Sequence, residues 1–219
     1  MSGFGLIRLM NWLSPVFPTG GFAYSGGLEQ AVREGTVADE AALGDWLETL
    51  ISHGSIRNDL ILLAAAWKQQ AAGGPLDDLA ATAIALCGSA ERKLETVAQG
   101  QAFAEALKSW PEAGRTACPP DTPQPVIVGA ACQDGGIALA DALSGFLQAF
   151  ASNQLQAAIR LSVIGQSGAA RLLAKLEPLL VKAAADAAER TLDDLGGATV
   201  MAEIASMNHE TLDGRLFRS

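Results

Sequence analysis

Apolar side chains recur at helical spacing along much of the chain. After Asp39 they fall at i, i+3, i+4, i+7 and i+8, on one face of a predicted helix: Leu43, Trp46, Leu47, Leu50 and Ile51. Asp39 is expected to cap this helix, because its carboxylate can accept hydrogen bonds from the unpaired amides of the first turn. Gly54 lies near the expected end of the helix.

The same spacing predicts further helices on both sides of a proline-rich segment. Before it, they begin near Asn58 and cover 76–86 and 90–110; after it, they cover 126–132, 137–164 and a stretch from Ala169 onward. Pro178 lies inside the last pattern and is expected to kink that helix or to start a new one. Residues 111–125 are rich in proline and lack periodicity, so we expect a loop that joins two helical halves.

Composition supports a helical protein with a buried core. Hydrophobic residues make up 49% of the 219 residues, charged residues 18% and aromatic residues 5%, with alanine abundant. We therefore expect an all-α fold, a single-domain helical bundle of roughly eight to ten helices that spans 1–219 and ends in an extended C-terminal tail at 196–219.

Charge, hydropathy and cysteine content limit the partners and the cellular compartment that we expect for the protein. A formal net charge of -9 disfavours binding to nucleic acid, because an acidic surface repels phosphates. The apolar run at 60–67 is too short for a membrane span, which needs about 20 residues. The three cysteines are scattered and form no CxxC pair, and the first residues do not resemble a signal peptide. We expect a cytoplasmic protein that does not bind a membrane.

Motifs for catalysis or metal binding are incomplete. Gly21 and Gly26 have the spacing of a phosphate-binding loop, but the lysine and the hydroxyl residue that should follow are missing. His209 and Glu210 begin like a zinc-protease helix, but Asp213 stands where the second histidine belongs. With His53 as the only other histidine, we expect no self-contained metal site and no cofactor, although a site shared across an interface would use His209. The chain is predicted not to be an enzyme.

The carboxylates near the N-terminus and the cysteine in the middle of the chain do not indicate a catalytic site. Glu29 is interpreted, with its acidic neighbours, as a solvated or capping carboxylate rather than half of an acid–base pair. Cys87 is interpreted as buried and inert.

Two segments allow both a structural and a functional interpretation. Residues 14–25 combine prolines, glycines and aromatic residues, including Tyr24, and form either a well-packed turn or an interface. Residues 196–219 are polar and predict either a frayed terminus or a segment that becomes ordered on a partner. In the second case, Leu216 and Phe217 would be apolar anchors between two arginines.

Motifs at both ends of the chain resemble those of the UreF family of urease accessory proteins. The first resembles the family's SPxxPxGxFxYSxGLE opening: Ser14-Pro15, Pro18, Gly20, Phe22, Tyr24-Ser25 and Gly27-Leu28-Glu29. The last two resemble the family's ending: Ser206-Met207-Asn208-His209-Glu210-Thr211 and Arg215-Leu216-Phe217-Arg218-Ser219. Residues 153–166 are similar to the segment through the family's PLGQ motif, although Val163-Ile164 replaces Pro-Leu.

The resemblance implies an all-α homodimer that binds the accessory protein UreD (UreH in some species), the GTPase UreG and apo-urease. It implies a scaffold that regulates GTP-dependent delivery of nickel. It places the UreD/UreH contact on the tail, from His209 to Phe217, and a UreG-facing or dimer role on Tyr24, Arg160 and Gln166. The residues implied in partner binding are Tyr24, Glu29, Arg160, Gln166, His209, Glu210, Arg215, Leu216, Phe217 and Arg218. The alternative is a small all-α enzyme or ligand carrier with a pocket near Tyr24 and Gln166.

Overall fold

All regular structure in the described residues is helical. The computed structural model describes residues 3–17, 20–110 and 116–219. Its elements are α1 (Gly3–Trp12), α2 (Leu28–Arg33), α3 (Glu40–His53), α4 (Ser55–Ala71), α5 (Asp77–Ala85), α6 (Ala90–Leu107), α7 (Gln124–Asp134), α8 (Leu139–Arg160), α9 (Gln166–Glu189), the 3-10 helix η2 (Leu192–Asp194) and α10 (Val200–His209). The all-α expectation is confirmed. Pro18 of the opening motif and Pro111 of the predicted loop lie outside the described residues.

Local sequence signals fix several helix ends. The side chain of Asp39 accepts a hydrogen bond from the amide of Ala42 at 2.9 Å, so the predicted cap of α3 is confirmed. Gly54 ends α3 and begins α4, because the two helices meet at this one residue.

Prolines do not break helices where the sequence suggested. α9 continues from Gln166 to Glu189 through Pro178, so of the two alternatives, a kink or a new helix, the new helix is excluded. Packing along the rest of α9 offsets the one backbone hydrogen bond that a proline cannot donate. Pro125 belongs to α7 rather than to the loop, because the first turn of a helix tolerates a residue without an amide hydrogen.

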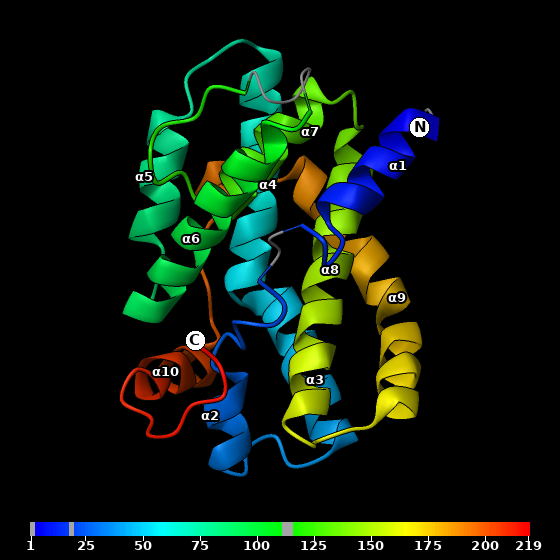
Figure 1. Ribbon diagram of the computed structural model, residues 1–219, viewed down its shortest axis with the longest axis vertical. Coiled ribbons are helices and arrows are strands. Elements are labelled where there is room, and N and C mark those ends of the chain that lie inside the picture. The colour runs from blue at the N-terminus through cyan, green and yellow to red at the C-terminus, as the bar shows by residue number, and fades with distance from the viewer. Residues whose placement is uncertain (1–2, 18–19, 111–115) are drawn as a thin grey trace.

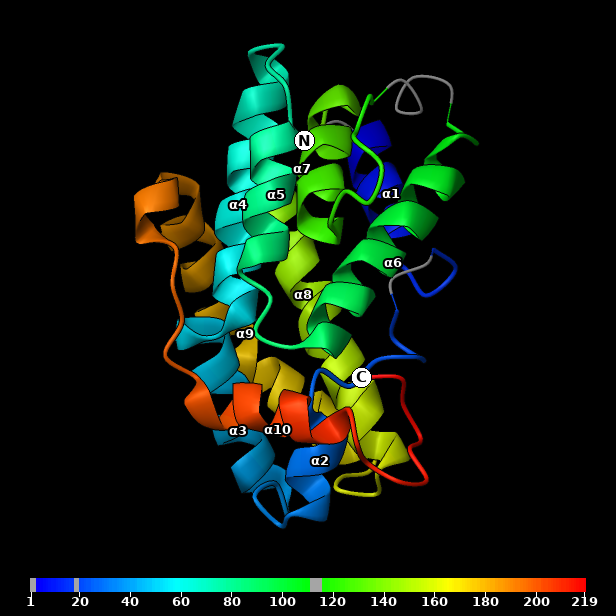
Figure 2. The same ribbon diagram turned by 90° about the vertical axis from the view of Figure 1, so that its left-hand side faces the viewer.

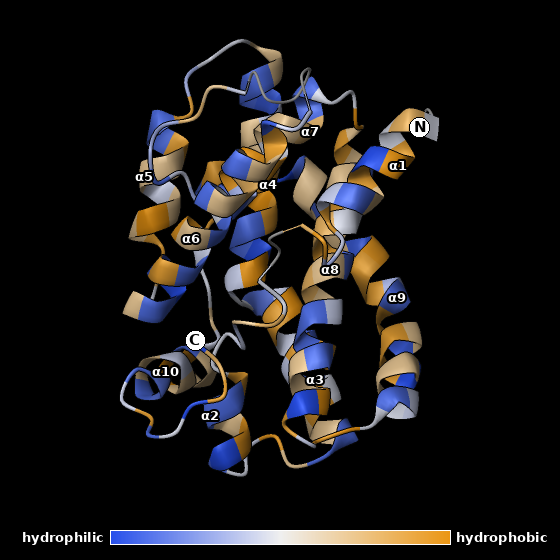
Figure 3. Cartoon of the chain, viewed as in Figure 1, coloured by the Kyte–Doolittle hydropathy of each residue, from blue (hydrophilic) through white to orange (hydrophobic). Residues whose placement is uncertain are grey.

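The helices enclose one main apolar core. Every described α-helix except α5 contributes side chains to it, and α5 packs with α4 and α7 in a second, smaller cluster. α8 runs along the middle of the molecule beside α9, whereas the short helices α2 and α10 lie together at one end (Figure 1). Hydrophobic and hydrophilic residues are mixed along most helices, as amphipathic helices require (Figure 3).

Close packing of α4 against α7 depends on a small residue. A Cβ atom at Gly129 of α7 would overlap the carbonyl oxygen of Leu63 in α4. We expect Gly129→Ala to lower the free energy of unfolding by about 1–3 kcal/mol, the usual cost of overpacking a core. Gly165→Ala is the matched control, because no atom lies within 4 Å of the added Cβ. Urea titration of both variants measures the difference, and equal stabilities would contradict the expectation.

Two remaining expectations concern burial. No helix of the described segments is long and apolar enough to cross a bilayer. Cys87, interpreted as buried and inert, is only partly buried, but burial raises the pKa of its thiol and favours the unreactive protonated form.

Candidate functional site

The C-terminal segment folds back onto the body of the protein. α10 lies across α2, and residues 210–219 return beside α2 towards the N-terminal loop at 20–27 (Figures 1 and 2). Of the two alternatives for this segment, a frayed terminus does not hold, because Phe217 and Ser219 are buried and most of the segment makes polar contacts with the body. We call residues 210–219 the tail.

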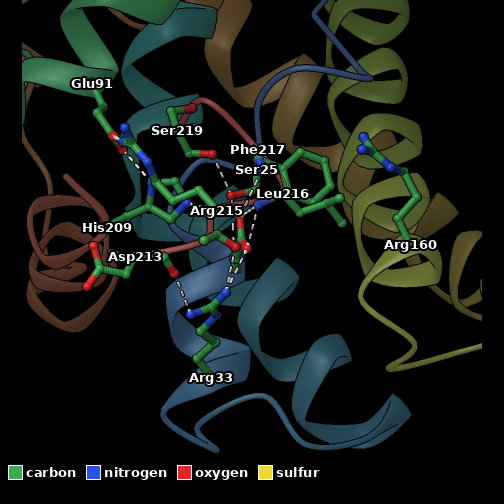
Figure 4. A network of polar contacts seen from close by, with 12 residues as sticks. Ser25, Arg33, Glu91, Arg160, His209, Asp213, Arg215, Leu216, Phe217 and Ser219 are labelled. Carbon is green, nitrogen blue, oxygen red and sulfur yellow. Dashed lines mark hydrogen bonds and ion pairs between the residues drawn. The ribbon is translucent and has the colours of Figure 1, made fainter. Parts of the chain in front are cut away.

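Glu29 of α2 is the central acceptor for the tail. Its carboxylate accepts from the amide of Leu216 at 2.9 and 3.1 Å and from the amide of Phe217 at 2.9 Å. Figure 4 shows Leu216 and Phe217 in the polar network that also contains His209 and Arg215. The residue is 2% exposed, so its interpretation as a solvated carboxylate was wrong. A carboxylate removed from water is retained only where such donors and positive charge replace its hydration.

His209 joins three elements of the chain. Its ring is fully buried (0% exposed), with Nε2 3.2 Å from Glu29 of α2 and Nδ1 2.7 Å from Glu91 of α6. Arg215 of the tail forms an ion pair with Glu91, and Arg33 of α2 lies 3.8 Å from Glu29, so an arginine accompanies each of the two buried carboxylates.

Acid is expected to loosen this site. Burial raises the pKa of the Glu29 carboxyl, but the amides of Leu216 and Phe217 and the contact with His209 outweigh burial and lower it overall. A lowered pKa adds stability that is present above the unfolded-state pKa and is lost as pH falls through the folded-state pKa. We therefore expect the free energy of unfolding to fall below about pH 4.5. A smaller acid dependence in Glu29→Gln, measured by urea titration, supports the assignment, and an unchanged one contradicts it.

Phe217 is held in the core by an arginine of α8. The residue is 3% exposed, and the guanidinium carbon of Arg160 lies 4.2 Å from the centre of its ring. Arg160 also donates to the backbone oxygen of Phe22 at 2.6 Å. A cation over an aromatic face attracts the ring's negative charge, so Arg160 connects the tail to the N-terminal loop.

Backbone pairing strengthens this connection. The amide of Arg218 donates to the oxygen of Ala23 at 2.7 Å, and the amide and hydroxyl of Ser25 both donate to the oxygen of Ser219 at 2.6 Å. Gln154 of α8 donates to the oxygen of Ser25 at 3.1 Å. The loop and the tail therefore form one packed unit, and the interpretation of 14–25 as a well-packed turn holds for residues 20–25.

The remaining candidates divide between this unit and the rest of the surface. Tyr24 is buried in the loop, and Glu210 accepts from the amide of Ala90 at 2.8 Å, at the start of α6. Gln166 is exposed at the start of α9 and does not line the cavity that Tyr24 lines. The prediction of a pocket near both Tyr24 and Gln166 was therefore wrong for Gln166.

Several residues of the site were missed from the sequence. Glu91 and Ser25 pair with residues more than 100 positions away, as does Arg33, which donates to the oxygens of Asp213 and Gly214 at 2.9 Å. Ser25 stands in the opening motif, so the motif could have indicated it. Glu91 follows a helix cap and carries no local signal of a distant partner.

A cavity of about 120 Å³ lies beside the site, between α4, α6, α8 and α10. Its wall includes Tyr24, Arg92, Glu95 and Gln154. The side-chain oxygen of Gln154 is buried and has no hydrogen-bond partner among the described residues. Within the same residues, no group of three or more histidine, cysteine or acidic side chains could hold a metal ion.

Fold and site define an all-helical protein whose own C-terminal segment closes a buried ion-pair network. A sequence model of one family, described as UreF, matches residues 37–177. The urease accessory protein UreF of Mesorhizobium japonicum is 52% identical over 100% of this chain and 98% of its own length. The protein of that name from Brucella ovis is 52% identical over 98% and 94%. The chain therefore belongs to the UreF family of urease accessory proteins.

Proposed function

We propose that this protein is the non-catalytic scaffold of a urease-activating complex, which binds UreD/UreH through α10 and the tail. The supporting observation is the exposed apolar surface of this region. Val200, Met201, Ile204 and Met207 of α10 are exposed at helical spacing, and Leu216 of the tail is 50% exposed. An apolar surface of this kind on a soluble helical protein is suited to a protein partner.

The division between buried and exposed tail residues assigns them different roles. Phe217, His209 and Arg215 hold the tail on the body, whereas Leu216 and the exposed face of α10 meet the partner. Phe217 thus acts as an internal anchor and not as the partner contact suggested by the resemblance. Arg218 and Glu210 position the tail through the loop and α6.

A second surface is proposed for UreG and for a second copy of the chain. Phe22 is 75% exposed in the loop that Arg160 holds, beside a groove between α1, the loop and α8. Met10 of α1 and Val16 are also exposed there. This surface supports a homodimer and a contact with UreG next to it, through which the scaffold regulates the GTP-dependent delivery of nickel to apo-urease in the cytoplasm. Gln166 would face the same partner from α9.

Charge substitutions on α10 and the tail test the UreD/UreH contact. Met201→Asp or Leu216→Asp is expected to weaken co-purification with UreD/UreH at least about tenfold, because each buries a charge in the interface. Val181→Asp on α9 is the control, since Val181 is equally exposed and lies on another helix. Retention of UreD/UreH by both test variants would refute the assignment.

The cavity beside Tyr24 supports a second candidate, a small enzyme or ligand carrier. The buried oxygen of Gln154 without a partner is the observation that favours it. Calorimetry of the pure protein with nucleotides and metal salts distinguishes the two candidates. Stoichiometric binding with turnover would favour the enzyme, and no heat of binding would favour the scaffold.

A further inference from the structure

A groove continues the exposed apolar face of α10 onto α3. Its walls come from α3, from residues 36–37 before that helix and from the start of α10, and its volume is about 430 Å³. Val200 and Met201 belong both to this groove and to the exposed face of α10. Val37, Trp46 and Leu50 supply further apolar surface. We call this feature the α3–α10 groove.

Contacts within the chain hold the two walls of the groove in place. The amide of Ala198, just before α10, donates to the oxygen of His53 at the end of α3 at 2.9 Å. Arg57 of α4 donates to the oxygens of Asp194 and Gly196 at 2.8 and 3.2 Å. The groove is therefore formed before a partner arrives, which lowers the entropy cost of filling it.

Asp45 of α3 gives the groove a negative charge. Among the described residues that line the groove it is the only charged one, and it is exposed. Within the same part of the chain its carboxylate has no hydrogen bond or ion pair at contact distance. Lys175 of α9 is close enough to interact electrostatically with Asp45, but its ammonium group pairs with Glu48 at 2.9 Å. The groove thus combines apolar walls with a carboxylate that has no direct partner.

The exposed face of α10 is too small to hold a partner by itself. α10 has 10 residues. A helix of that length is about 15 Å long and about 10 Å across. One side of a specific protein interface buries about 800 Å². A partner on α10 must therefore cover neighbouring surface as well, and the α3–α10 groove is continuous with that face through Val200 and Met201.

We propose that the α3–α10 groove receives an arginine side chain of the partner that binds α10, and that its guanidinium pairs with Asp45. The aliphatic stem of an arginine suits the walls at Trp46 and Val200, and its planar head can donate two hydrogen bonds to one carboxylate. A purely apolar side chain would remove water from Asp45 without replacing it, which is costly. The inference rests on the proposed function, in which this partner is UreD/UreH.

Charge variants of Asp45 test the proposal. Binding of the full-length chain to immobilised UreD/UreH is measured by surface plasmon resonance. Asp45→Asn should weaken binding about tenfold, and Asp45→Lys at least about a hundredfold, because the first removes an attraction and the second adds a repulsion. Binding by Asp45→Asn should also depend less on salt concentration, since one ion pair fewer is screened.

Glu177→Gln is the matched control for these variants. Glu177 is exposed on α9 and does not line the groove, so the loss of its charge should leave binding as in the natural protein. Circular dichroism of all three variants should show unchanged helicity, because both positions are exposed. Natural affinity in both Asp45 variants would overturn the proposal. It would also be overturned if Asp45→Lys disrupted only self-association of the chain, since a second copy would then occupy the groove.

A charge exchange tests the identity of the incoming side chain. Exposed arginines and lysines of UreD/UreH are replaced by glutamate one at a time, and each variant is tested against Asp45→Lys. We expect one arginine replacement to restore most of the lost binding, as two residues in direct contact should. Restoration by a lysine replacement, or by none, would overturn the assignment of an arginine.

Leu216→Asp separates this inference from the proposed function. Weaker binding of UreD/UreH by Leu216→Asp, with natural binding by both Asp45 variants, would keep UreD/UreH on the tail and remove only the groove proposal. Natural binding by all three variants would remove UreD/UreH from the whole region. Weaker binding by the Asp45 variants alone would keep the groove and remove the tail contact.

Discussion

Phe217→Ala is expected to release the tail while the other helices stay folded. The substitution removes a buried ring and its contact with Arg160, a loss of about 3–5 kcal/mol for a phenylalanine in a core. The tail joins the body through local contacts with α2, α6, α8 and the N-terminal loop, so this loss should act on docking rather than on the whole fold. Proteolysis within 210–219 should become at least about tenfold faster at unchanged helicity.

The neighbouring residue provides the control for this variant. Leu216→Ala changes an exposed side chain and keeps the backbone amide that donates to Glu29, so proteolysis of the tail should remain as in the natural protein. Both variants should bind UreD/UreH more weakly, but for different reasons. Loss of protection in Leu216→Ala, or none in Phe217→Ala, would contradict the assignment of Phe217 as the internal anchor.

Glu29→Gln should be among the most destabilising single substitutions in the chain. It removes the negative charge between His209 and the tail amides and leaves His209 with one carboxylate fewer. Breaking a buried ion pair by removing one partner costs about 3–5 kcal/mol. For a chain of this length we expect the midpoint of thermal unfolding to fall by on the order of 10 °C.

A surface carboxylate gives the comparison. Glu48 pairs with Lys175 at 2.9 Å, but both side chains are exposed, so Glu48→Gln should change the free energy of unfolding by less than about 1 kcal/mol. Differential scanning calorimetry of the two variants measures both effects. Similar midpoints would mean that the Glu29 network contributes little to stability.

Local features of the fold could be predicted from the sequence. The apolar spacing after Asp39 and the cap at Asp39 involve residues within one or two turns of each other, and both were confirmed. At Pro178 local preference left a kink or a new helix open, and tertiary packing retains one continuous helix there.

The site could be predicted only in part. The family motifs indicated both ends of the chain, but not that the two ends pack on each other. Glu29 and His209 are 180 positions apart, and the residues around them in the sequence do not indicate that the carboxylate of one and the ring of the other form a hydrogen bond. The polar composition of the tail suggested that it is exposed. Hydropathy does not show that Glu29 accepts hydrogen bonds from the tail amides or that Glu91 pairs with Arg215.

In the function proposed above, the docked tail gives the partner a preformed surface. A segment that is already ordered loses less conformational entropy on binding than a disordered one, so more of the contact energy remains as affinity. Loop and tail also share Arg160, which places the two proposed partner surfaces on one connected unit.

Reconstitution of urease activation tests the central claim most directly. Urease subunits and the other accessory proteins are co-expressed with and without this chain, and the nickel content and activity of urease are measured. We expect both to be lost when the chain is omitted, restored when it is added back, and not restored by Leu216→Asp. Full nickel loading and activity without the chain would contradict the account.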